Sequence, residues 1–191
     1  MTVDDAAAAF SLREADDRAL VRAFLAGRAE AFDVIVERHQ RQVYQLCYRF
    51  VSNHEDASDL TQDVFIRAFK GLKNFKGDSA LSTWLYRVGV NACLNRVSLK
   101  QIKLETIEPE QHVDHRQPDA HELAARAERA VVVRRAIAKL PPKQRATLVL
   151  RMYQDMTHEE IAAVLGGSVG AAKANLFHAL ANLKRYLAEA E

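Results

Sequence analysis

The sequence predicts an all-α fold in which a flexible linker joins two small helical domains. Alanine has the highest helix propensity and occurs 31 times, whereas the 191 residues include only seven glycines and four prolines. All-β folds need many turns, and turns consume glycine and proline. Apolar residues also recur at helical spacing along most of the chain. The exception is 101–122, where two prolines occur and acidic residues outnumber basic ones by six to two, so we expect the linker there.

The first domain is predicted from three helical segments. No glycine or proline occurs between Gly27 and Gly71, and apolar residues at helical spacing in this interval predict a helix. The polar patch 52–55 interrupts this helix and supplies N-cap residues for a second one, which runs to about Phe69. A third helix follows the loop at 74–79. The predicted boundaries are 1–15 for a flexible N-terminus, 16–100 for the first domain, 101–122 for the linker and 123–191 for the second domain.

The second domain is predicted as four helices. The first spans 123–140, and a second can occupy 143–153 because proline is tolerated in a first helical turn. Thr157 and Glu160 have the spacing of a capping box, which opens a short third helix. The glycines at 166–167 end that helix as a C-cap and turn.

The last helix, from Ser168 to about Leu187, completes a helix-turn-helix pattern. In that motif the second helix lies in the major groove, and its N-terminal residues contact base edges. Lys173 can donate to phosphate or guanine, and Asn175 can donate or accept at a base edge. Residues 123–191 contain 11 basic and six acidic residues, which favours DNA binding over the alternative of an ordinary αα-hairpin in a bundle. The candidate contacts are Ser168, Val169, Gly170, Ala171, Lys173, Ala174, Asn175 and His178.

In the first domain an acidic segment is followed closely by a basic one. The segment 55–63 contains four acids and no base, and Asp56, Asp59 and Asp63 share one helical face. The segment 67–103 contains eight bases and one acid. An acidic face repels DNA and suits a basic protein partner, whereas a basic stretch suits a nucleic-acid backbone. Either run alone could be a solvated face, but their adjacency in one small domain favours two binding surfaces.

Aromatic residues lie within the basic stretch, and a basic groove with exposed rings can hold a single strand because bases stack on rings. Asn91 and Asn95 lie four residues apart, so they share a helical face and could read an unstacked base in a pocket. For Trp84 and Phe69 the alternative is ordinary core packing. The aromatic residues concerned are Phe69, Phe75, Trp84 and Tyr86.

Several motifs match a known family. In the first domain they are the segments 56–65, 75–80 and 83–87, followed by Asn91. In the second domain they are Leu140-Pro141-Pro142, the segment 157–162 and Val169-Gly170. Together these motifs resemble the bacterial extracytoplasmic-function (ECF) sigma factors over roughly residues 15–187, with both halves in order.

The resemblance implies three binding surfaces. The clamp helices of RNA polymerase are expected to contact Asp56, Asp59, Leu60, Gln62, Asp63 and Phe65. The −10 promoter element is expected to be opened and read by Phe75, Lys76, Gly77, Asp78, Ser79, Trp84, Arg87, Asn91 and Asn95. The −35 element is expected to meet the helix-turn-helix residues given above, together with Thr157 and His158.

The resemblance also implies a function and partners. The chain is expected to be a non-catalytic promoter-specificity subunit that binds core RNA polymerase through the polymerase's clamp helices and flap. Promoter DNA would be double-stranded at −35 and single-stranded at −10. The linker would thread near the polymerase active centre and RNA exit path. Such factors typically respond to stress or envelope signals and are held inactive by an anti-sigma factor.

The last helix departs from the family pattern. The family usually continues V-G-T-V-[KR]-S-R-L-x-R-A-R, whereas here Asn175, His178 and Leu180 stand at basic positions. Each lost phosphate contact should lower the salt slope of DNA binding by about one. Either the −35 preference is unusual, or other bases such as Arg151 and Lys184 compensate.

Other classes of function lack sequence support. We find no glycine-rich phosphate loop, metal-ligand spacing or nucleophile motif, so we expect no catalytic residue, metal or cofactor. Cys47 and Cys93 lack CxxC spacing and are expected to be reduced thiols of a cytoplasmic protein. No run of ~18 apolar residues predicts a membrane span, and the N-terminus is unlike a signal peptide. The alternative function is a stand-alone helix-turn-helix regulator, which would not need the acidic face.

Overall fold

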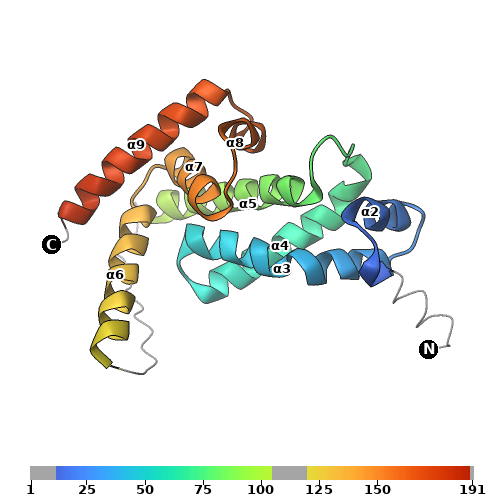
Figure 1. The fold of residues 1–191 in the computed structure, drawn as a ribbon, viewed down its shortest axis with the longest axis horizontal. Coiled ribbons are helices and arrows are strands. Elements are labelled where there is room, and N and C mark those ends of the chain that lie inside the picture. Colours follow the sequence, from blue (N-terminus) through green and yellow to red (C-terminus); the bar gives the residue numbers. More distant parts are fainter. Residues whose placement is uncertain (1–11, 105–119, 190–191) are drawn as a thin grey trace. The chain divides into compact units, whose positions relative to one another are not determined.

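The computed structural model describes residues 12–104 and 120–189, with side chains described for 12–97 and 129–189. Within these ranges every regular element is a helix, which confirms the predicted all-α class (Figure 1).

The chain divides into two compact units. The first comprises the residues up to Tyr48 together with Asn53–Ala92, and the second comprises Arg49–Ser52 together with the chain from Cys93 onward. Helix α5 (Leu81–Leu104) continues past residue 100 and helix α6 (Ala120–Ala138) begins before residue 123. Both helices therefore enter the segment predicted as a linker, and residues 105–119 lie outside the described residues.

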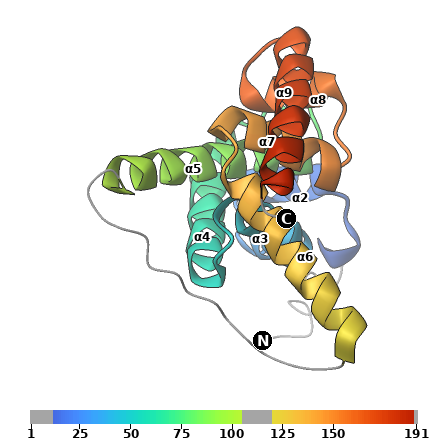
Figure 2. The ribbon, with the colours of Figure 1, turned by 90° about the vertical axis from the view of Figure 1, so that its left-hand side faces the viewer.

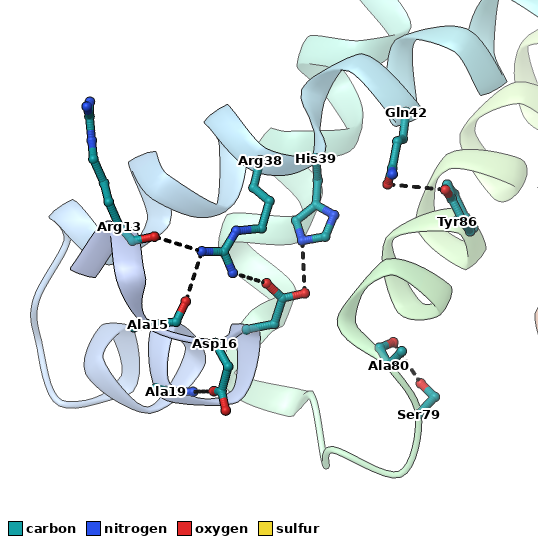
Figure 3. A network of polar contacts seen from close by, with 11 residues as sticks. Arg13, Ala15, Asp16, Ala19, Arg38, His39, Gln42, Ser79, Ala80 and Tyr86 are labelled. Atoms are coloured by element: carbon teal, nitrogen blue, oxygen red, sulfur yellow. Dashed lines mark hydrogen bonds and ion pairs between the residues drawn. The ribbon is translucent and has the colours of Figure 1, made fainter. Parts of the chain in front are cut away.

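The described part of the first unit contains the three predicted helices, one further α-helix and a short 3-10 helix. Its elements are α2 (Asp17–Leu25), α3 (Glu30–Val51), α4 (His54–Gly71), the short 3-10 helix η1 (Leu72–Asn74) and the start of α5. The predicted cap of α4 is confirmed, because the Asn53 side chain accepts a hydrogen bond from the backbone N–H of Asp56 at 2.9 Å. Helix α2 has no counterpart among the predicted elements. Its N-cap is Asp16, whose carboxylate accepts from the backbone N–H of Ala19 at 2.7 Å (Figure 3).

Helices α3, α4 and α5 meet closely at Gly89. A Cβ atom at this position would lie 2.9 Å from Cδ2 of Leu46 on α3 and 3.8 Å from Cγ2 of Val64 on α4. Both neighbours are fully buried, so they have little space into which they could move. The absence of a side chain at Gly89 therefore lets α5 approach α3 closely, while the contact with Val64 on α4 would be an ordinary one.

Asp17 holds α2 against α3. Its Oδ1 accepts a hydrogen bond from Nη1 of Arg38 at 2.6 Å, and its Oδ2 accepts from Nε2 of His39 at 3.0 Å. Nη2 of Arg38 also donates to the carbonyl oxygens of Ala15 at 2.9 Å and of Arg13 at 3.3 Å (Figure 3). Part of the predicted flexible N-terminus is therefore tied to the first unit, whereas residues 1–11 lie outside the described residues.

The second unit contains the four predicted helices, with a first helix that begins three residues early. They are α6, α7 (Pro142–Tyr153), α8 (His158–Leu165) and α9 (Val169–Ala188). Helix α9 packs against α6, α7 and α8 (Figure 2). Its buried face closes a small core made of Ile137, Leu140, Leu148 and Ala179, around which Val133, Leu176, Leu183 and Tyr186 are partly buried.

Replacing Asp17 with alanine is expected to lower the free energy of unfolding by about 2 kcal/mol, because buried His39 and its neighbour Arg38 lose a charged acceptor. Urea unfolding followed by circular dichroism measures this change. The matched control is Asp33→Ala, since Asp33 is an exposed acid in the first turn of α3. The control should cost less than about 1 kcal/mol. Equal losses in the two variants would contradict the role given to Asp17.

Candidate functional site

Helix α4 presents the predicted acidic face to solvent. Asp59, Gln62 and Asp63 are exposed, and Asp56 is half-buried near the capped start of the helix. The carboxylate of Asp63 accepts a hydrogen bond from Arg67 at 3.0 Å, and both side chains are about half exposed. An exposed pair one turn apart contributes little to stability. These carboxylates therefore remain accessible to a partner.

Two residues expected on this face are not on the surface. Leu60 and Phe65 are only 5% and 7% exposed, and the Phe65 ring packs edge-on against Phe32 on α3 with centroids 6.4 Å apart. Their assignment as direct polymerase contacts is therefore corrected. They anchor α4 to the core, because burying large apolar side chains removes hydrophobic area from water.

Ile66 belongs to the exposed face of α4 but was not among the predicted residues. Its side chain is 53% exposed. It follows Asp63 by three residues and Gln62 by four, so it shares their face. The same spacing rule that grouped the acids could have found it. The rule was applied only to charged side chains, so this apolar neighbour was passed over.

The four aromatic residues of the basic stretch have different environments. Tyr86 is 7% exposed and donates a hydrogen bond to Oε1 of Gln42 at 3.3 Å (Figure 3). Burial raises the pKa of its hydroxyl, so Tyr86 is a neutral core residue and is not available to stack on a base. Phe69 is 49% exposed, but its ring also contacts those of Phe24 and Phe32, each with centroids 5.1 Å apart.

Trp84 and Phe75 form a half-buried pair at the start of α5. Their ring centroids lie 5.5 Å apart. Gly71 lies directly beneath the indole, since a Cβ there would lie 3.4 Å from Cζ2 of Trp84. The pair thus closes the end of α4 against the start of α5, and both residues remain partly exposed.

The loop between η1 and α5 has a constrained backbone at Gly77. Its φ of 78° lies in the left-handed region that favours glycine. Lys76 and Asp78 on either side are exposed, and Ser79 donates through Oγ to the carbonyl oxygen of Ala80 at 3.3 Å (Figure 3). The loop therefore offers a cation and an anion to solvent next to the aromatic pair.

The exposed side of α5 carries the polar residues predicted to read DNA. Arg87, Asn91 and Asn95 are all exposed, and each follows the previous one by four residues. Leu85 and Val90 lie on the buried side of the same helix. The two amides therefore face solvent together, as their spacing predicted.

The predicted helix-turn-helix is confirmed in its details. The Thr157 hydroxyl accepts from the backbone N–H of Glu160 at 3.2 Å, and the Glu160 carboxylate accepts from the backbone N–H of Thr157 at 2.8 Å, which completes the capping box. Gly166 ends α8 with a left-handed φ of 65°. The Ser168 hydroxyl caps α9 by accepting from the backbone N–H of Ala171 at 3.1 Å.

The residues predicted to read duplex DNA are mostly on the surface. Val169, Asn175 and His158 are half-buried. Thr157 and Ser168 are exposed, but their hydroxyls are engaged in the caps just described. The remaining predicted residues are exposed, namely Gly170, Ala171, Lys173, Ala174 and His178.

A negative charge lies beside these residues. A hydrogen bond from its own backbone N–H, another from the Thr157 hydroxyl and the positive charge of Lys173 lower the pKa of Glu159. Its carboxylate is therefore firmly ionised and partly offsets the charge of Lys173. The negative charge of Glu159 thus lowers the net positive charge of this surface, which already has fewer basic residues on α9 than the family pattern.

The described residues hold no metal-binding cluster. None of their His, Cys, Asp and Glu side chains gather in threes or more. Cys47 and Cys93 are buried and form no disulfide. None of the helices within 12–104 and 120–189 has the length and apolarity needed to cross a membrane.

The chain therefore consists of two helical units, and the second unit contains a helix-turn-helix formed by α8 and α9. The chain belongs to the ECF RNA polymerase sigma factors. The family model described as Sigma-70 region 2 matches residues 35–101, and that described as Sigma-70, region 4 matches residues 130–183. Membership makes the chain a sigma subunit of RNA polymerase, which is a non-catalytic part of the initiation machinery.

Characterised relatives resemble this chain over most of its length. The ECF RNA polymerase sigma factor SigM of Mycobacterium tuberculosis strain H37Rv is 37% identical over 174 residues, which cover 91% of this chain and 86% of SigM. The RNA polymerase sigma-H factor of Pseudomonas aeruginosa is 32% identical over 178 residues, which cover 88% of this chain and 92% of that factor.

Solved structures share the fold. CnrH, in complex with the cytosolic domain of CnrY, matches with a TM-score of 0.67 and 28% identity over 92% of this chain and 99% of that one. The sigma factor RpoE of Bartonella quintana, in complex with the anti-sigma factor NepR, matches with a TM-score of 0.64 and 21% identity over 82% of this chain and 96% of that one.

Proposed function

We propose that this sigma factor directs core RNA polymerase to promoters by reading a −35 and a −10 element, and that it promotes strand opening at −10. One observation carries the proposal. Within the first unit, α4 exposes an acidic face whereas α5 exposes Arg87 and Asn91, and the exposed Asn95 follows on the same helix in the part assigned to the second unit. A surface that repels DNA and a surface that can bind DNA thus belong to one rigid unit, which suits a protein that bridges polymerase and promoter.

The exposed face of α4 is the proposed polymerase contact. Asp59, Gln62 and Asp63 are arranged with Ile66 on adjacent turns, so acidic groups flank an exposed apolar side chain. Protein interfaces commonly combine an apolar centre with a polar rim. Charge complementarity to a basic partner surface then sets orientation and speeds encounter. Leu60 and Phe65 support this surface from below.

The exposed face of α5 and the loop before it form the proposed −10 contact. Arg87 can bind a phosphate, and the amides of Asn91 and Asn95 can hydrogen-bond the edge of an unstacked base. The accessible parts of Phe75 and Trp84 offer a place for stacking. Energy from holding unpaired bases would then favour the open form of the DNA.

The second unit is the proposed −35 reader. The N-terminal half of α9 is capped and exposed, as a helix that enters the major groove must be. Its domain is proposed to span 123–191, and the first domain 16–100. The intervening linker is proposed to run near the polymerase active centre and RNA exit path, and the second unit to contact the flap.

Control by an anti-sigma factor in the cytoplasm, in response to stress or envelope signals, completes the proposal. It is supported by the family resemblance and by the similar fold of a sigma factor solved with its anti-sigma partner. The alternative, a stand-alone regulator, would bind DNA without core polymerase and would make no use of the α4 face.

Charge reversal on α4 tests the polymerase contact. The double variant Asp59→Arg, Asp63→Arg is expected to weaken binding to core polymerase at least about tenfold, because like charges would then oppose a basic partner. Fluorescence titration of labelled chain with core enzyme measures the affinity. Asp33→Arg is the control, since it reverses an exposed acid on another helix. If core polymerase binds the double variant as tightly as it binds the unaltered chain, the assigned contact is wrong and the stand-alone regulator is favoured.

Asn91→Ala tests the −10 contact. Loss of the amide is expected to reduce discrimination between correct and altered −10 sequences by about fivefold or more, while core binding stays unchanged. Abortive initiation on promoter pairs that differ only at −10 gives the ratio. Gln40→Ala, which removes an exposed amide from α3, should change neither the discrimination between −10 sequences nor the affinity for core polymerase. An equal loss of core binding and discrimination in Asn91→Ala would make Asn91 structural.

A further inference from the structure

The largest exposed side chain at the DNA-reading end of α9 is apolar. Phe177 is 70% exposed, more than any other large apolar side chain of the described residues. Its ring contacts His178 edge-on, with centroids 5.5 Å apart, and this contact leaves most of the ring uncovered. On a helix proposed to enter the major groove, an exposed aromatic ring gains most from contact with an apolar group of the DNA, because the contact removes apolar surface from water.

The same surface offers few hydrogen-bonding groups. Residues 168–178 include no arginine, glutamine, aspartate or glutamate. Lys173 and His178 are exposed, while Asn175 is half-buried. The bidentate arginine that reads guanine, and the glutamine that can read adenine, are therefore missing from this helix.

Small apolar residues continue the surface from Phe177 toward the helix N-terminus. Ala174 and Ala171 precede it at successive intervals of three residues, and both are exposed. Ala172 and Ala179 lie on the opposite, buried side of α9. The three exposed residues, Ala171, Ala174 and Phe177, thus form one apolar ridge across the outer surface of the helix.

We infer that this apolar ridge reads the 5-methyl groups of thymines, so that the −35 element is selected at thymines by apolar contact instead of by arginine–guanine hydrogen bonds. The inference rests on the proposed function. Thymine alone presents a methyl group in the major groove, and alanine and phenylalanine are side chains that can contact it. The two alanines leave room for the helix to approach the base edges closely.

Duplex DNA is the occupant that the charges favour. Lys173 is exposed near the start of the ridge, and Lys184 and Arg185 are exposed further along the same helix. The second domain has five more basic than acidic residues over 123–191. An apolar strip with cations along its length matches a groove whose floor carries methyl groups and whose walls carry phosphates.

Replacing thymine by uracil tests the inference, because uracil lacks only the methyl group. Holoenzyme formed from this chain and core polymerase would first select −35 sequences from a randomised promoter pool. Each thymine of the selected element would then be replaced singly by uracil, and affinity measured by competition. At least one replacement is expected to weaken binding about threefold to fivefold, the effect of burying one methyl group. In Phe177→Ala holoenzyme the same replacement should cost less than about 1.5-fold.

The control is Met152→Ala, which also shortens an exposed apolar side chain of the second unit but lies on α7, outside the ridge. It should keep the uracil penalty. The inference is overturned if no replacement weakens binding, or if the penalty persists in Phe177→Ala, and the ring would then be assigned to a protein partner. Failure to select any −35 sequence would refute the proposed function itself, and this inference with it.

Discussion

The first unit depends on the contact at Gly89, where α5 comes closer to α3 than a side chain would allow. Cδ2 of Leu46 fills the space that a Cβ atom would need, whereas Cγ2 of Val64 would lie at ordinary contact distance, so this glycine lets α5 pack closely on α3 beside α4. Close packing of this kind resists deformation. The acidic face of α4 and the part of α5 that carries Arg87 and Asn91 are consequently packed on one core within the first unit.

Burial then decides which side chains of each helix remain available. On α4 the apolar residues Leu60 and Phe65 are covered, and the acids with Ile66 are left outside. In the second unit the same division is made on the short helix α8 and the longer helix α9, whose N-terminal ends are fixed by the Thr157 capping box and the Ser168 cap. Caps leave the start of α9 both ordered and exposed, which is what a reading helix requires.

Local signals explain why much of this could be predicted from the sequence. The capping box, the αL glycine and the Asn53 cap each involve residues within four positions of one another, so spacing alone revealed them. Periodicity also placed Asn91 and Asn95 on one exposed face. What could not be predicted depends on distant partners. Asp17 meets Arg38 and His39 more than 20 positions away, so spacing could not reveal that this segment is tied to α3, whereas α2 itself has a local cap at Asp16 that the sequence analysis passed over. Tyr86 and Phe65 looked available because a pattern cannot tell which face another helix will cover.

Run-off transcription with purified core polymerase on a library of promoter fragments tests the central claim, that two separate surfaces of one chain confer promoter specificity. With the full chain present, we expect transcripts from a subset of fragments that share two sequence elements, one near −35 and one near −10, at a constrained spacing. Core polymerase alone should show no such subset. Transcripts that do not exceed those of core alone, or a subset that shares only the −35 element, would contradict the account.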